Sequence, residues 1–157
     1  MYDPMWLFFD ARNMAHMLEF SNKYAAKSYN IDPSRFDRVL FANEFLTSDL
    51  RADWMDEGNS RYCSQSAYDS FCEYISKSCD DTVEKFVSDT GDNIEDMLLY
   101  WVGDTITRIR YKADLSMRNT LKVLSLQDLI DYYYPWHELS FSQVWDRVKD
   151  SFIKKEY

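Results

Sequence analysis

Glycine, proline, cysteine and histidine are all scarce in this sequence of 157 residues, which contains three glycines, three prolines, three cysteines and two histidines. Sheet proteins need glycine and proline at their many tight turns, so the shortage favours helices joined by short polar loops. Phosphate-binding loops also depend on glycine, and neither Gly-x-Ser-x-Gly nor a glycine-rich phosphate loop occurs. The sequence therefore contains no nucleotide-binding loop or nucleophile motif of the usual kinds.

Metal and cofactor sites are not indicated either. His16 and His137 stand in no HExxH or ExxH pattern, and Cys63, Cys72 and Cys79 lack the spacing of zinc ligands. The alternating acids of a calcium loop are absent as well. We therefore expect neither a metal ion nor a cofactor.

The cysteines and the lack of a long apolar run indicate in which cellular compartment the protein is expected. Cys72 and Cys79 are seven residues apart and share one face of a predicted helix, so we expect buried free thiols in a reducing, cytoplasmic setting. No stretch approaches the ~20 apolar residues of a membrane span. Residues 1–10 lack the basic region that begins a signal peptide.

The clearest helical pattern covers residues 92–114. Apolar side chains recur there every three or four residues and form one stripe along a helix. They are Ile94, Leu98, Val102, Ile106, Ile109 and Ala113, with Leu99 and Trp101 widening the stripe. Asp92 can cap the first turn, and the order of acidic and basic residues agrees with the helix dipole. Gly103 does not fit the pattern, and it indicates either close packing by a second helix or a break.

Weaker patterns predict the remaining helices. Residues 4–28 predict a helix, which is favoured over a strand at residues 5–9, and further helices are predicted over residues 33–46, 48–58, 66–79, 81–91, 125–134 and 141–155. Ser125 with Asp128 resembles a capping box, and Ser140 with Gln143 matches one. Residues 120–124 fit either a short strand or a helical turn. The predicted fold class is all-α, a compact irregular bundle of about seven helices in a single domain over residues 1–157.

The net charge of −9 is concentrated in one part of the sequence. Residues 49–104 contain fourteen acidic and four basic residues, whereas residues 105–157 contain seven acidic and nine basic residues. An acidic chain is a poor direct binder of nucleic acid, because phosphates attract cations. It is well suited to a partner protein with a basic surface.

Two groups of acidic residues are the candidate partner-binding residues. Carboxylates one helical turn apart and consecutive phosphates are both ~6 Å apart, so an acidic helix can imitate a row of phosphates. Several of these acids are explained equally well as helix caps, and the others as solubilising charges. The groups are Asp49, Asp53, Asp56 and Glu57, and then Asp80, Asp81, Glu84, Asp89, Asp92, Glu95 and Asp96.

Aromatic residues 132–137 form a second candidate surface. Tyrosine and tryptophan dominate the hot spots of protein interfaces, so Tyr133 and Trp136 are candidates for contact with a partner or with a second copy of the chain. The alternative is that the run divides between the core and the surface.

One segment resembles the beginning of PIN-like and NYN-like ribonucleases. In WLFFDARNMAHMLEF, Asp10 ends an apolar run and Asn13 begins a helix, and Asp104 ends a second apolar run. LKVLSLQDLIDYY resembles the late strand and helix of such folds, but Ala11 replaces the glycine expected beside the first aspartate. The resemblance implies a parallel sheet with Asp10 and Asp104 at strand ends, where they would hold Mg²⁺. Otherwise Asp10 and Asn13 are solvated helix positions.

Among these possibilities we favour a non-catalytic protein. We expect it to inhibit a basic partner, such as a nuclease or another nucleic-acid-handling enzyme, by occupying the cationic surface of that partner. DNA-mimicking phage anti-defence proteins and toxin-immunity proteins use this strategy. The metal-dependent ribonuclease and a structural helical interaction module are the two alternatives.

Overall fold

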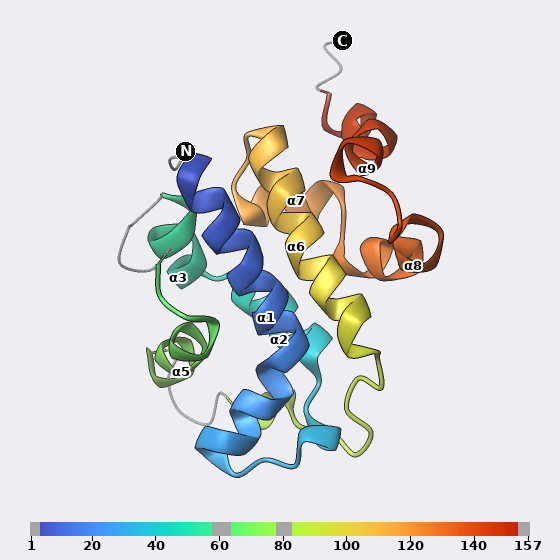
Figure 1. Ribbon diagram of the computed structural model, residues 1–157. Helices are drawn as coiled ribbons and strands as arrows, with labels where there is room; N and C mark the ends of the chain where they lie inside the picture. The colour runs from blue at the N-terminus through green and yellow to red at the C-terminus, as the bar shows by residue number, and fades with distance from the viewer. Residues whose placement is uncertain (1–3, 58–63, 78–82, 154–157) are drawn as a thin grey trace.

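The computed structural model describes residues 4–57, 64–77 and 83–153, and its regular structure over these ranges is helical (Figure 1). The α-helices are α1 (Pro4–Tyr29), α2 (Arg38–Leu46), α3 (Asp49–Arg51), α5 (Ala67–Lys77), α6 (Asp96–Ala113), α7 (Met117–Val123), α8 (Leu126–Trp136) and α9 (Phe141–Val148). The shorter turns are η1 (Pro33–Arg35), the π-helical η2 (Ala52–Asp56), η3 (Glu84–Phe86) and η4 (Lys149–Phe152). The all-α prediction is confirmed for the described residues, where seven helices have seven residues or more.

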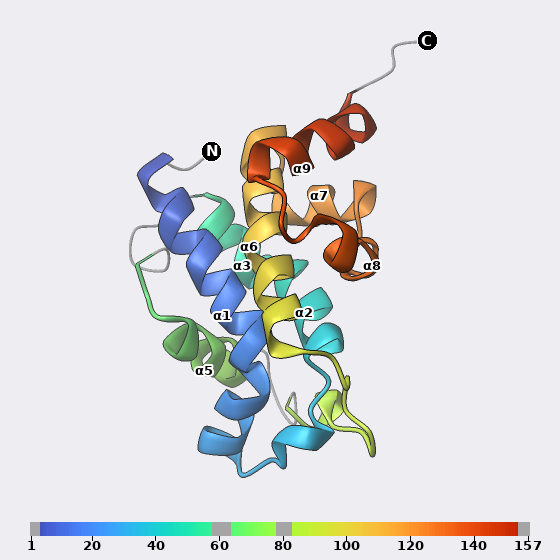
Figure 2. The same cartoon turned by 45° about the vertical axis from the view of Figure 1, so that its right-hand side comes forward.

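Helices α1 and α6 lie side by side at the centre of the molecule (Figures 1 and 2). Each has a fully buried apolar stripe, which includes Met14 and Leu18 on α1 and Val102 and Ile106 on α6. The helix predicted over residues 4–28 is confirmed. The alternative strand at residues 5–9 is wrong, because this segment is the first part of α1.

Gly103 is the point of closest approach between α1 and α6. A Cβ atom at this position would lie 2.5 Å from the carbonyl oxygen of Met14 and 2.8 Å from the Cα atom of Ala15. These are backbone atoms in the middle of a long helix, so they have little room to move. Of the two interpretations of Gly103, close packing by a second helix is therefore correct, and α6 continues through the residue without a break.

Replacing Gly103 with alanine is expected to destabilise the protein. Alanine favours a helix over glycine by ~1 kcal/mol, but its methyl group must push α1 away from α6, and such overpacking costs about 1–3 kcal/mol. The free energy of unfolding, measured in urea, should fall, whereas replacing the exposed Lys112 of α6 with alanine should change it by no more than ~0.5 kcal/mol. A more stable Gly103→Ala protein would contradict the close contact.

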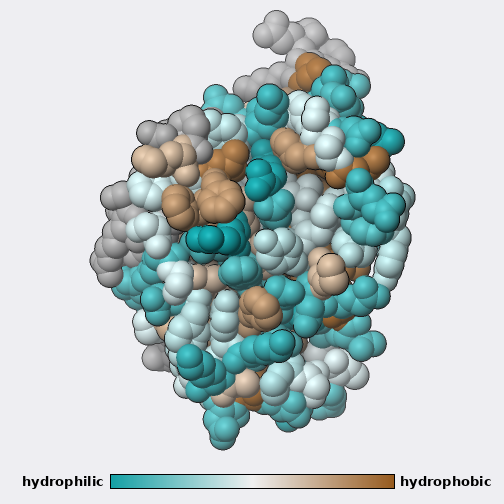
Figure 3. All heavy atoms as spheres, viewed as in Figure 1, coloured by the Kyte–Doolittle hydropathy of each residue, from teal (hydrophilic) through white to brown (hydrophobic). Residues whose placement is uncertain are grey.

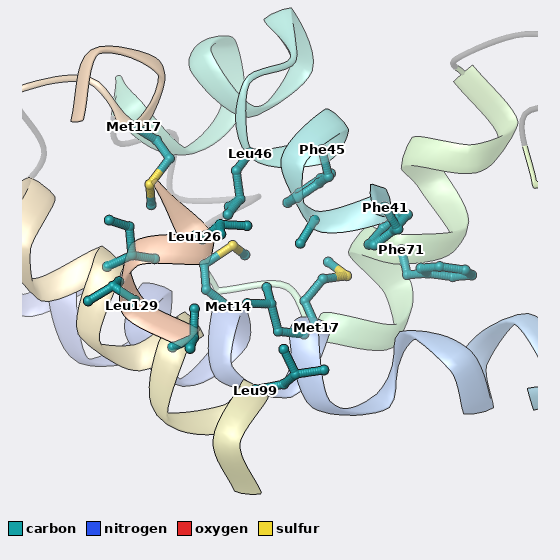
Figure 4. Packing of buried hydrophobic residues seen from close by; sticks show 14 of the residues in the cluster. Met14, Met17, Phe41, Phe45, Leu46, Phe71, Leu99, Met117, Leu126 and Leu129 are labelled. Carbon is teal, nitrogen blue, oxygen red and sulfur yellow. The ribbon is translucent and has the colours of Figure 1, made fainter. Parts of the chain in front are cut away.

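The core is formed by side chains from most of the helices (Figure 4). Met14 and Met17 of α1 lie at its centre, with α2 and α5 on one side and α7 and α8 on the other. Aromatic rings fill the side near α5, where the Phe41 ring centroid is 5.1 Å from that of Phe71 and 5.3 Å from that of Phe86. One cluster of buried hydrophobic residues thus connects the helices, while the assignment of residues 1–157 to a single domain stays a prediction.

The C-terminal helices begin at capping residues. In α8 the Ser125 Oγ accepts from the N–H of Asp128 at 3.0 Å, and in α9 the Ser140 Oγ accepts from the N–H of Gln143 at 3.2 Å, so both predicted capping boxes are confirmed. Residues 120–123 lie in α7, which corrects the possible short strand at 120–124. Ser116 caps this helix, and the burial of Met117 and Thr120 holds it against the core.

The segment before α6 differs from the predicted helix over residues 81–91. Its described part contains one 3₁₀ turn, η3, followed by extended chain, because its backbone pairs with residues 35–37. The N–H of Asp37 donates to the carbonyl of Phe86 at 2.7 Å, and the N–H of Ser88 donates to the carbonyl of Arg35 at 2.8 Å. Helix α6 consequently begins at Asp96 rather than at Asp92. The predicted helix over residues 141–155 is also shorter, with α9 followed by η4.

No helix among the described residues is long and apolar enough to cross a membrane.

Cys72 on α5 is a free thiol, as predicted, although its side chain is only partly buried. Cys63 and Cys79 lie outside the described residues.

Candidate partner-binding surface

The first acidic group lies on α3 and η2, and three of its four members form an exposed edge. Asp49, Asp53 and Glu57 follow one another at intervals of four residues, so consecutive members are about one turn apart on the same side. The Asp49 side chain is 89% exposed and pairs with Arg118 at 2.6 Å. Among the described residues, neither Asp53 nor Glu57 has an ion-pair partner. We call these three residues the acidic edge.

The opposite side of α3 and η2 is buried. Arg51 is fully buried and donates to both oxygens of Asp10 on α1, at 2.6 and 2.8 Å. The same guanidinium lies 3.4 Å from Asp56. This bidentate pairing fixes both the position and the orientation of the arginine.

Asp56 extends this buried network to α6 and α7. Its carboxylate lies 3.1 Å from Nε of Arg110 and accepts from the backbone N–H of Met117 at 3.1 Å. Arg110 also donates to the Asp56 carbonyl at 3.2 Å. Asp56 was a candidate for partner contact, but it is buried and occupied by these contacts. The π-helical turn lets Arg51, Met55 and Asp56 face inward together while the acidic edge faces solvent.

Asp92 belongs to a second buried ion-pair network, which is centred on Arg38. The Asp92 side chain is 4% exposed and accepts from Nε of Arg38 at 2.9 Å and from Nη2 at 3.0 Å. It also accepts from the backbone N–H groups of Arg38 and Ile94, at 2.7 and 2.9 Å. Burial alone would raise the pKa of Asp92, but these hydrogen bonds outweigh it and hold the pKa below its usual value. Asp92 thus anchors Arg38 instead of capping α6, which corrects its predicted role.

The other described acids of the second group remain accessible. Glu84 and Asp89 are exposed, with Asp89 3.5 Å from Arg35. Asp96 pairs with Arg38 at 2.6 Å and Glu95 accepts from the Tyr134 hydroxyl at 2.6 Å. Asp80 and Asp81 lie outside the described residues.

The two acidic groups do not form one continuous belt. Helix α3 lies beside the N-terminal half of α1, whereas η3 and the chain leading to α6 lie near its C-terminal half (Figures 1 and 2). The sequence places both groups within residues 49–104, but the fold separates them. A partner that contacts the acidic edge therefore meets the second group only if it extends along much of the molecule.

The aromatic run divides between the core and the surface, as its alternative interpretation predicts. Tyr133 is buried and its ring centroid lies 5.7 Å from that of Trp101. Trp136 is partly exposed and stacks on Tyr132, with ring centroids 4.1 Å apart. Of the two aromatic candidates, only Trp136 is accessible to a partner in this conformation.

The residues of the ribonuclease resemblance occupy helices. Asp10 lies in α1 and is bound by Arg51, Asn13 donates to the Gln65 carbonyl at 2.6 Å, and Asp104 accepts from Arg108 at 2.9 Å within α6. The described part of the chain contains no strand whose end could place Asp10 beside Asp104. Nor do the described residues contain a group of three or more His, Cys, Asp or Glu side chains suited to a metal ion. The fold implied by the resemblance is therefore wrong for these segments.

Sequence reasoning missed the buried partners Arg38, Arg51 and Arg110. A signal for Arg110 was present, because it lies four residues after Ile106 on the apolar stripe of α6. Asp10 likewise lies four residues before Met14 on the buried face of α1. A charge on the apolar face of each of two predicted helices indicates that the helices share a buried ion-pair network.

Comparisons with protein-family models, with curated proteins and with solved structures gave no match.

Proposed function

We propose that the protein is a non-catalytic inhibitor that binds a basic partner, in the manner of DNA-mimicking anti-defence proteins and toxin-immunity proteins. The partner proposed is a nuclease or another nucleic-acid-handling enzyme, and the contact is made with its cationic surface. The observation that carries the proposal is the acidic edge, in which three exposed carboxylates at one-turn intervals lie on a segment anchored by buried ion pairs.

The anchoring supports recognition of a fixed pattern of cations. Arg51 and Asp56 attach α3 and η2 to α1, α6 and α7, so the carboxylates of the edge start from a defined backbone position. A binding surface that is already ordered loses less conformational entropy when the partner binds. The ~6 Å interval between carboxylates one turn apart also suits cations that are spaced to contact phosphates.

The buried charges of the described residues cancel one another. Among the described residues, the buried cations Arg38, Arg51 and Arg110 are balanced by the buried carboxylates of Asp10, Asp56 and Asp92. Burial of these six side chains therefore takes no net charge away from the surface, and the chain as a whole carries −9. A field of this sign accelerates the approach of a cationic partner, and salt weakens it.

Charge reversal of the acidic edge tests the proposal. The Asp49→Lys, Asp53→Lys, Glu57→Lys variant should keep its fold, because exposed charges contribute little to stability. It should associate with the basic partner about tenfold more slowly at low salt, and its rate should depend less on salt. The partner is first captured on the wild-type protein at low salt and eluted with high salt, and association rates are then measured over a salt series.

The matched control reverses three exposed acids elsewhere, Asp131, Glu138 and Asp146, and changes the net charge by the same amount. Its association should be slowed less than that of the edge variant. Equal rates for the two variants would show that only net charge matters and that the edge is not the contact surface. Magnesium-dependent nuclease activity of the pure wild-type protein would overturn the inhibitor proposal and support the ribonuclease alternative.

A further inference from the structure

The first three turns of α1 have an exposed apolar face, which is not part of the acidic edge. Met5 is 60% exposed, Phe8 57% and Phe9 36%. The space-filling view shows apolar side chains gathered over the N-terminal part of α1, next to hydrophilic ones (Figure 3). The rings contact one another, with the Phe9 centroid 5.7 Å from that of Phe8 and 5.9 Å from that of Trp6.

The exposure follows from the length and position of α1. The opposite side of the same turns is used for the core and for the buried network, where Asp10, Ala11 and Met14 are at most 1% exposed. The outward side therefore faces solvent. The residues Met5, Phe8, Phe9 and Arg12 stand at positions i, i+3, i+4 and i+7, which is the pattern of a helix that packs against another helix. We call these four residues the α1 face.

Arg12 gives the α1 face a local positive charge. Its guanidinium lies 5.2 Å from the ring centroid of Phe8 and 5.6 Å from that of Phe9, in cation–π geometry. Within the described residues Arg12 has no carboxylate partner, so its N–H groups are available to an acceptor. One turn further on, burial and the charge of Arg12 both lower the pKa of His16. Arg12 thus places a positive charge beside the exposed rings of the α1 face.

We infer that the α1 face is a docking surface for an amphipathic helix of a second partner protein, with a carboxylate on the apolar side of that helix positioned to bind Arg12. Methionine, aromatic residues and arginine are the residues most enriched in interface centres, and all of them occur here. The spacing of the α1 face favours a helical partner, and the guanidinium of Arg12 favours an acidic residue on that helix. A second copy of the chain fits less well, because two molecules of net charge −9 repel each other.

The probe is a display library of helical peptides with apolar positions at i, i+3, i+4 and i+7 and random neighbours. Selection on the wild-type protein should enrich peptides with Asp or Glu beside the apolar positions. Selected peptides, synthesised and titrated, should bind Phe8→Ser at least tenfold more weakly, and should bind Arg12→Gln severalfold more weakly. The matched control Leu40→Ser, which alters an exposed apolar residue on α2, should bind as the wild type does. Both Phe8→Ser and Leu40→Ser change exposed side chains, and circular dichroism checks that each is folded.

Three outcomes would overturn the inference. They are the selection of peptides with Lys or Arg beside the apolar positions, an affinity that Phe8→Ser leaves unchanged, and no enrichment over a library panned without the protein. Light scattering of the wild-type protein provides a separate test. A dimer that Phe8→Ser converts to a monomer would assign the face to a second copy of the chain instead.

Discussion

The Arg51→Ala variant is expected to lose about 3–5 kcal/mol of stability, the usual cost of removing one partner from a buried ion pair. The substitution leaves the Asp10 carboxylate buried beside α3 without the two hydrogen bonds that it accepts from Arg51. Since small proteins are stable by only ~5–15 kcal/mol in total, the variant should be close to unfolding at 37 °C. Urea unfolding followed by circular dichroism measures the change.

Two comparison variants separate the buried pair from an ordinary surface pair. Arg118→Ala removes the exposed partner of Asp49 and should cost no more than ~1 kcal/mol. The double variant Arg51→Met, Asp10→Leu removes both charges and should recover most of the stability, because apolar residues can replace a buried pair at little cost. If Arg51→Ala is as stable as Arg118→Ala, then water reaches the Asp10–Arg51 pair in solution.

Replacing Val102 with aspartate is expected to unfold the protein or nearly so. Val102 is fully buried on the apolar stripe of α6, within the cluster of buried hydrophobic residues. An unpaired buried charge costs several kcal/mol, a large fraction of the total stability. The expected result is loss of the cooperative thermal transition, measured by circular dichroism and calorimetry.

Val123 provides a control with the same chemistry at an exposed position. It is the last residue of α7 and is 40% exposed, so a new carboxylate there stays in contact with water. Val123→Asp should melt cooperatively within a few degrees of the wild type. A Val102→Asp protein with an unchanged melting temperature would show that the stripe on α6 faces solvent.

The helices were predictable because their signals are local. In each capping pair, Ser125 with Asp128 and Ser140 with Gln143, the two residues are only three positions apart. The apolar stripe of α6 likewise repeats within one helix. The segment before α6 was not predictable in this way. Its backbone bonds to residues 35–37, about fifty positions earlier, and no local pattern reports such a partner.

The sequence is also limited in predicting which acidic residues are exposed. In the sequence, Asp56 and Glu57 are neighbours of equal charge, yet Asp56 is buried against Arg110 whereas Glu57 is exposed. The π-helical turn decides which of them faces inward, and a turn of this kind has no reliable sequence signature. Asp92 shows a second limit. A carboxylate that caps a helix and a carboxylate that binds a buried arginine both stand just before a helix, so the position in the sequence does not distinguish them. The sequence therefore located the acidic segments, but the fold determines which acids are available to a partner.

The close contact at Gly103 also has a consequence for the order in which the protein acquires its structure. It joins Met14 and Ala15 to a residue almost ninety positions later in the chain. During synthesis, α1 leaves the ribosome long before α6 exists, and until then the part of its apolar stripe that packs on α6 is uncovered, although α2 and α5 are already made. Closing a loop of this length costs conformational entropy before the contact can form, and this cost slows folding. The nascent chain thus spends much of its synthesis with part of its longest helix uncovered, a state in which exposed apolar surface favours aggregation and a net negative charge opposes it.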